Sequence, residues 1–163
     1  MKSNLQILAL EEMRRTFDQY ASASDALDSK AKSLLSSSSL IIGLFSLLQL
    51  SLNPLQNEKG YSCIYQIGVV AIMVGYIVLV ALCTKTLRPR EYKNAIATNW
   101  NDLNTYFLQK EEDEAYRILI GTYLTSIEAN KNTNLEKAKY VNKATWIFVA
   151  LVVGLFFISF LPH

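Results

Sequence analysis

Three long apolar stretches, residues 34–52, 63–84 and 144–161, stand out in the pattern of hydrophobic and polar positions along the chain. Each stretch is 18 to 22 residues long. An α-helix needs roughly 20 apolar residues to cross the hydrocarbon core of a bilayer. The pattern therefore predicts an all-α integral membrane protein with three transmembrane helices.

The segment before the first stretch carries apolar side chains at steps of three or four, which indicates a helix packed on one face. These side chains are Leu10, Met13, Phe17, Tyr20, Ala23, Leu27, Ala31 and Leu34. No Gly or Pro interrupts residues 1–42. We therefore expect an amphipathic helix over residues 1–33 that continues without a break into the first span.

The next two spans, 63–84 and 144–161, flank a polar segment over residues 85–143. Asn53-Pro54 and Lys59-Gly60 predict a short turn, so residues 34–84 read as a transmembrane hairpin. A helix is expected from about Glu111 towards Lys143. It either breaks near residues 130–134, where helix propensity is weak, or runs unbroken into the third span.

The distribution of positive charge predicts the orientation in the membrane. Of the 16 Lys and Arg, five precede the first span, one lies between the first two, ten lie in residues 85–143 and none follows the third. The positive-inside rule then places the N-terminus in the cytoplasm and the C-terminus outside. The net charge is only +2, and the chain has no dense stripe of basic residues of the kind that binds nucleic acids. No nucleic-acid partner is therefore expected.

The first span is unusually polar, and its small and polar residues share one side. They are Ser36, Ser39, Gly43, Ser46 and Gln49. They either pack against a neighbouring helix or line a water-filled pore in a homo-oligomer, since polar groups in a bilayer need partners or water. Gly68 and Gly75 form a small-residue face on the second span, where two helix backbones approach closely.

A basic cluster follows the second span, with Lys85, Arg88, Arg90 and Lys93 ahead of Trp100. Arg binds phosphate well and aromatic rings stack on bases, so these residues are candidates for a nucleotide site. The same residues equally serve as a topology signal that contacts anionic lipid.

No residue pattern indicates catalysis or metal binding. Glu111–Glu114 point in different directions on a helix and suit its positive N-terminal end. His163 has no second His or clustered Cys to complete a metal site. Cys63 and Cys83 lie too far apart along one helix to pair. We therefore expect a protein that is not an enzyme and holds no cofactor.

Two helices that enter spans, residues 26–35 with Asp28-Ser29-Lys30-Ala31 and residues 134–144 with Glu136-Lys137-Ala138-Lys139, resemble those of a known class of proteins. With Leu87-Arg88-Pro89-Arg90 after the hairpin, the layout resembles small bacterial anti-phage membrane effectors: the transmembrane effectors of Pycsar systems and the SLATT effectors. The resemblance implies an inner-membrane protein that is dormant until infection. It further implies that a cyclic nucleotide or another second messenger is sensed on the cytoplasmic side.

The leading hypothesis is a homo-oligomeric effector that is triggered from the cytoplasm and disrupts the inner membrane when its long helices shift. Either a cyclic nucleotide or a cytoplasmic protein would be the trigger. The alternative is a non-enzymatic scaffold or accessory subunit that recruits a cytoplasmic protein through residues 4–33.

Overall fold

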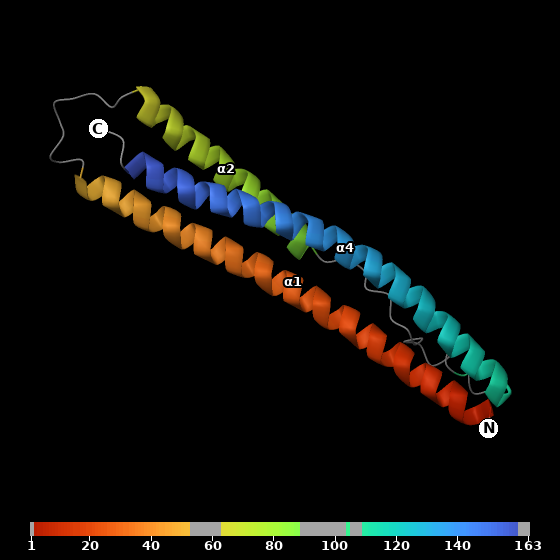
Figure 1. Ribbon diagram of the computed structural model, residues 1–163. Coiled ribbons are helices and arrows are strands. Elements are labelled where there is room, and N and C mark those ends of the chain that lie inside the picture. Colours follow the sequence, from red (N-terminus) through yellow and green to blue (C-terminus); the bar gives the residue numbers. More distant parts are fainter. Residues whose placement is uncertain (1, 53–62, 89–103, 105–108, 160–163) are drawn as a thin grey trace. The chain divides into compact units, whose positions relative to one another are not determined.

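Three helices make up the described part of the chain. A computed structural model describes residues 2–52, 63–88, 104 and 109–159, and the helices are α1 (Lys2–Leu52), α2 (Cys63–Leu87) and α4 (Glu112–Ser159) (Figure 1). The described residues contain no strand, which confirms the all-α prediction. They divide into two compact units, Met1–Ala26 with Pro89–Lys137 (unit 1) and Leu27–Arg88 with Ala138–His163 (unit 2).

Helix α1 is unbroken over 51 residues, and the absence of Gly and Pro from residues 1–42 predicts its continuity up to Gly43. Its less exposed side chains recur every seven residues in two rows. One row is Leu10, Phe17, Ser24, Ala31, Ser38 and Phe45, and the other is Met13, Tyr20, Leu27, Leu34 and Ile41. A repeat of 3.5 residues is typical of helices paired as in a coiled coil. Ala23 was predicted to lie on the packed face of this helix. That prediction is wrong, because Ala23 is exposed and the neighbouring Ser24 is buried instead.

Helix α4 is also unbroken, over 48 residues. The break considered at residues 130–134 does not occur. Asn130 and Asn134 are buried in unit 1, and the Asn134 side-chain amide donates a hydrogen bond to the Tyr20 carbonyl at 2.7 Å. Tertiary contacts of this kind outweigh a weak local propensity. Buried residues again recur every seven positions: Tyr123, Asn130, Lys137, Ala144, Leu151 and Ile158.

The core of unit 2 is apolar and draws on all three helices. Leu79 and Cys83 of α2 pack with Ala144 and Leu151 of α4. Leu34 and Leu35 of α1 pack against this cluster together with Ile72, Tyr76, Leu82, Ile147 and Phe148. Cys83 is a free, buried thiol, so it fills space here as a small apolar group.

Two glycines set the contact between α2 and α4. A Cβ on Gly68 would lie 2.8 Å from the Cδ1 of Ile158, and one on Gly75 would lie 2.9 Å from the Cδ2 of Leu151. Each bulky side chain of α4 therefore rests on bare α2 backbone. Gly68 and Gly75 thus permit a close approach between α2 and α4 within the chain.

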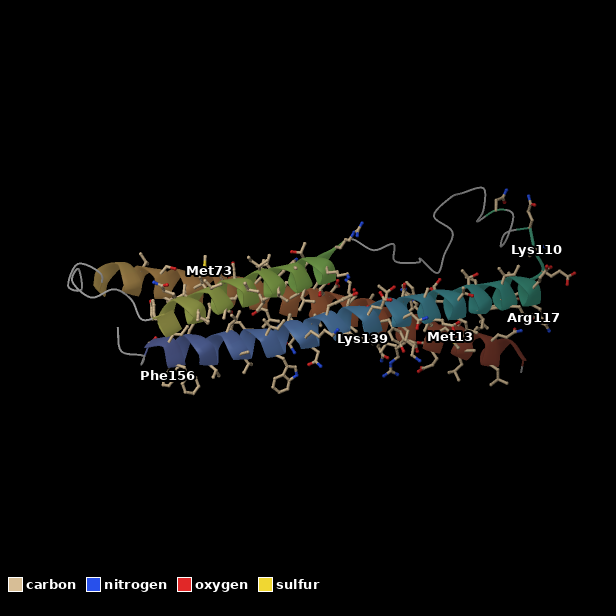
Figure 2. The ribbon with its side chains drawn as sticks, turned by 90° about the horizontal axis from the view of Figure 1, so that it is seen from above. Met13, Met73, Lys110, Arg117, Lys139 and Phe156 are labelled. Carbon is tan, nitrogen blue, oxygen red and sulfur yellow. The ribbon has the colours of Figure 1, made fainter. Side chains whose placement is uncertain are left out.

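Large apolar side chains cover the outside of unit 2. On α2 they are Ile67, Val70, Met73, Val74, Ile77 and Val78, and on α4 they are Trp146, Val149, Val152, Val153, Phe156 and Phe157. Figure 2 shows Met73 and Phe156 pointing away from the neighbouring helices. The core helix of a water-soluble protein would bury such side chains, whereas lipid accommodates them.

Two helices, α2 from Tyr65 and α4, are long and apolar enough to cross a membrane. They contain the predicted spans 63–84 and 144–161, although α4 is described as helix only to Ser159. Helix α1 does not qualify over its described residues. The first span, residues 34–52, therefore stays a prediction, and the expected turn at residues 53–62 lies outside the described residues.

The substitution Gly75→Leu tests the contact between α2 and α4. We expect it to lower the free energy of unfolding by about 1–3 kcal/mol, because the added side chain must displace Leu151 from a packed position. Gly121→Leu is the matched control, since nothing lies within 4 Å of a Cβ at Gly121. Thermal unfolding in detergent measures both variants, and equal melting temperatures would contradict this packing.

Candidate functional site

The most unusual feature of unit 1 is a run of buried polar side chains between α1 and α4. We call Ser24, Asn130, Asn134 and Lys137 the polar seam, because all four are buried at positions where a helix pair normally places apolar residues. The Lys137 ammonium donates to the Ser24 hydroxyl at 3.0 Å. One turn earlier on α4, the Asn134 amide holds the backbone of α1 at Tyr20.

Burying these groups costs free energy that only good partners offset. Lys137 is only 5% exposed, and Lys is rarely buried to that extent without a partner. No buried side-chain nitrogen or oxygen among the described residues lacks a hydrogen-bond partner. A satisfied polar pair in a helix seam fixes register, and it does so with less stability than an apolar pair would give. The hydrogen bonds of the polar seam therefore fix the register between α1 and α4 in unit 1.

Unit 1 has further contacts between the same two helices. The rings of Phe17 and Tyr123 meet edge to face, with centroids 5.9 Å apart. Nearer the N-terminus, the Gln6 amide donates to a carboxylate oxygen of Asp113 at 3.1 Å. These contacts occupy much of the face that the sequence analysis assigned to an amphipathic helix.

The acidic run at the start of α4 does not form a site. Lys110 pairs with Glu114 at 2.9 Å, and Asp113 accepts from Gln6. The Glu111 carbonyl accepts the backbone N–H groups of Glu114 and Ala115, at 3.0 and 2.9 Å. The run therefore begins the helix, as expected from the helix dipole.

The serine stripe of α1 lies outside the seven-residue rows and is exposed in the single chain. Ser36, Ser39, Gly43 and Ser46 are all exposed, and the side chain of Gln49 is outside the described part. Ser39 and Ser46 donate to the carbonyls of Leu35 and Ile42, at 2.8 and 2.9 Å. Ser39 also shares a hydrogen bond of 2.9 Å with the Tyr76 hydroxyl of α2.

Only part of the basic cluster is described. The Lys85 ammonium lies 4.9 Å from the centre of the Tyr140 ring, a distance typical of a cation–π contact. Arg88 is exposed just after the end of α2. Arg90, Lys93 and Trp100 lie outside the described residues. The described part of the chain contains no group of three or more His, Cys, Asp or Glu placed to hold a metal ion.

The polar seam was not predicted from the sequence. Asn130 and Asn134 have weak helix propensity, which favoured a break in the helix, and Lys137 is one of ten cations in residues 85–143. The missed signal is the exact seven-residue spacing from Asn130 to Lys137 to Ala144, which places a Lys and an Asn in the same row as core residues.

A double-mutant cycle tests the bond between Ser24 and Lys137. We expect Ser24→Ala and Lys137→Met to couple by about 1.5–3 kcal/mol in the free energy of unfolding, the usual strength of a hydrogen bond to a charged group. The control pairs Ser24→Ala with Lys139→Met, since Lys139 is exposed. Unfolding in mixed detergent measures all variants, and additive effects in the first cycle would overturn this bond.

Comparison with known proteins gives one match. A family model described as Pycsar effector protein domain matches residues 12–162. No curated protein and no solved structure matches the chain. The matched region takes in the polar seam, the serine stripe and all three predicted spans, and it confirms the resemblance found in the sequence. The chain belongs to the family of Pycsar effector proteins and is a membrane effector of anti-phage defence.

Proposed function

We propose that this effector is a homo-oligomer that a cytoplasmic signal opens, and that opening disrupts the integrity of the inner membrane. The exposed serine stripe on α1 is the observation that carries the proposal, because a polar face towards lipid is costly. The proposal has no catalytic step and needs no cofactor. It assigns three spans to the chain, with the N-terminus in the cytoplasm and the C-terminus outside.

In the oligomer, the serine stripes of several copies face one another around water. Two neighbouring faces of α1 differ in chemistry. Ser36, Ser39, Gly43 and Ser46 form one face, while Leu40, Leu44 and Leu47 form an exposed apolar face beside it. The leucine face suits lipid, and the serine face suits water or another copy. Ser39 and Ser46 donate hydrogen bonds to carbonyls of their own helix, which lowers the free-energy cost of placing these hydroxyls in contact with lipid. A closed state in which no water reaches the stripe is therefore possible.

The polar seam is the part that moves. Separating two apolar helix faces exposes them to water at a cost, whereas water can replace the hydrogen bonds of Ser24, Asn134 and Lys137. A trigger therefore needs only a modest difference in affinity between two alignments of α1 and α4. Both helices run without interruption into the segments predicted to span the membrane, so a shift at the seam reaches the serine stripe.

The trigger in this proposal is a cyclic nucleotide made by a partner enzyme, with Arg88, Arg90, Lys93 and Trp100 as its candidate contacts. Arg groups bind phosphate and an aromatic ring stacks on the base. A cytoplasmic protein is the other candidate trigger. A panel of cyclic nucleotides added to reconstituted protein separates the two, because a protein trigger predicts no leakage with any of them.

The scaffold alternative retains one supporting feature. Most of the face that would recruit a partner is occupied by contacts with α4, such as those of Phe17 and Tyr20. Leu5, Ile7 and Leu8 are nevertheless exposed at the start of α1. A scaffold predicts co-purification with one soluble protein and no leakage on overexpression.

The double variant Ser39→Leu and Ser46→Leu tests the pore lining. We expect triggered leakage of a small dye, in cells or liposomes, to fall by at least about tenfold. The leucine side chains would make the pore lining apolar, and an apolar constriction excludes water. Ser37→Leu is the control, since Ser37 is exposed on the leucine face rather than in the stripe. Undiminished leakage in the double variant would rule out the stripe as a lining.

The double variant Asn134→Leu and Lys137→Leu tests the moving part. An apolar seam holds a helix pair more firmly than a polar one. We therefore expect this variant to need more trigger, by about tenfold, for half-maximal leakage. The control adds Leu at the exposed positions Lys131 and Asn132. A trigger requirement at or below that of the natural protein would contradict a role for the seam in opening.

A further inference from the structure

The geometry points to a binding surface for anionic phospholipid headgroups, formed by six cations from all three helices at one level of unit 2. We call this surface the cationic collar. It consists of Lys30 and Lys32 on α1, Lys85 and Arg88 at the end of α2, and Lys139 and Lys143 on α4. The inference rests on the bilayer placement in the proposed function, but it requires no pore and no trigger.

Contacts within unit 2 fix the level of each cation. Gly68 lies against Ile158 and Gly75 against Leu151, while Lys85 lies on Tyr140. The two helices are therefore antiparallel and in register, so that a residue further along α2 is level with a residue equally far back along α4. Lys139 and Lys143 are therefore level with the last two turns of α2.

The same reasoning places the cations of α1. Ser39 bonds Tyr76, and α1 is antiparallel to α2 in unit 2 (Figure 1). Lys30 and Lys32 precede Ser39 by nine and seven residues, so they are level with the residues nine and seven after Tyr76, which are Lys85 and Cys83. At 1.5 Å per residue, all six cations fall within a band about 8 Å deep along the helices.

The depth of this band matches a layer of lipid headgroups. The polar region on each side of a bilayer is about 5–8 Å thick, judged from the difference between total and hydrocarbon thickness. Exposed apolar side chains begin next to the band, and Trp146, which is 70% exposed, lies one turn beyond Lys143. Trp favours this boundary between headgroups and hydrocarbon. In Figure 2, Lys139 and Phe156 lie near the two ends of the α4 portion of this unit.

Positive charge predominates at the level of the collar, although the acidic Glu136 lies one turn before Lys139 along α4. All six side chains belong to exposed residues, and Asp28 is the single acidic residue among the described residues of unit 2. The six cations come from three helices, so the positive charge is distributed over unit 2 rather than carried by one short segment. A distributed surface of this kind fits several separate headgroups, such as those of phosphatidylglycerol. Each basic residue near an anionic surface strengthens the attraction about fivefold.

The test compares lipid retention by three forms of the full-length protein in detergent. The first is the natural protein. The second is Lys32→Gln, Lys139→Gln, Lys143→Gln, which leaves the Lys85–Tyr140 contact intact. The third removes equal charge from exposed positions of unit 1, with Lys110→Gln, Arg117→Gln, Lys131→Gln. Native mass spectrometry measures how strongly each form retains phosphatidylglycerol over phosphatidylcholine.

We expect the natural and unit 1 forms to prefer phosphatidylglycerol, and the collar variant to lose at least about tenfold of that preference. The corresponding Lys→Arg triple should retain it. An equal preference in the collar variant, an equal loss in the unit 1 variant, or displacement of the lipid by millimolar inorganic phosphate would each overturn the inference.

A second measurement needs only the natural protein, in case the collar variant does not insert. Its preference for phosphatidylglycerol should fall when NaCl rises from about 0.1 M to about 1 M, because salt screens exposed charges. A preference that is absent at low salt, or that is unchanged by salt, would contradict the collar. Because neither measurement involves leakage, failure of the pore proposal would not affect the result.

Discussion

The seven-residue spacing of buried side chains along α1 and α4 is the constraint on which the structure depends. It gives each helix continuous rows of less exposed side chains that face other helices. The chemistry of these rows differs between the two units. In unit 1 they include Ser24 on α1 and Asn130 and Lys137 on α4, whereas in unit 2 the α4 row continues with Ala144, Leu151 and Ile158.

That difference has a physical rationale for a membrane effector. Lipid cannot replace a lost polar contact, so the packing inside a bilayer relies on close-fitting small and apolar groups such as Gly75 under Leu151. In water, polar contacts exchange readily with solvent, because the net gain from each bond is small. Under the proposed function, the polar half of the helix pair lies outside the membrane, where its contacts exchange with water, and the apolar half lies inside it.

Much of the fold could be predicted from the sequence because its main signals are local. The long apolar runs and the absence of Gly and Pro before Gly43 led directly to continuous helices, and the family resemblance was confirmed. The polar seam could not be predicted in the same way. The low helix propensity of Asn134 favours a break in the helix when the sequence is considered alone. The side-chain amide of Asn134 instead donates a hydrogen bond to the backbone carbonyl of Tyr20, which is distant in sequence.

The surroundings of the serine stripe likewise could not be predicted from the sequence. Its polarity is evident from the sequence, yet the single chain leaves Ser36 and Ser46 exposed, so what covers them depends on lipid, water or further copies. The first span, residues 34–52, is the step that connects the stripe to the membrane. Its serines dilute an otherwise apolar run, and the account depends on its crossing the bilayer.

The most direct test of the account is to locate the two ends of the chain relative to the membrane. Single cysteines at Ser3 and at His163, in a background without Cys63 and Cys83, can be labelled in intact cells by a reagent that does not cross the inner membrane. Three spans predict that the label reaches position 163 and reaches position 3 only after the cells are opened. Labelling of both positions, or of neither, in intact cells would place the ends in one compartment and contradict the account.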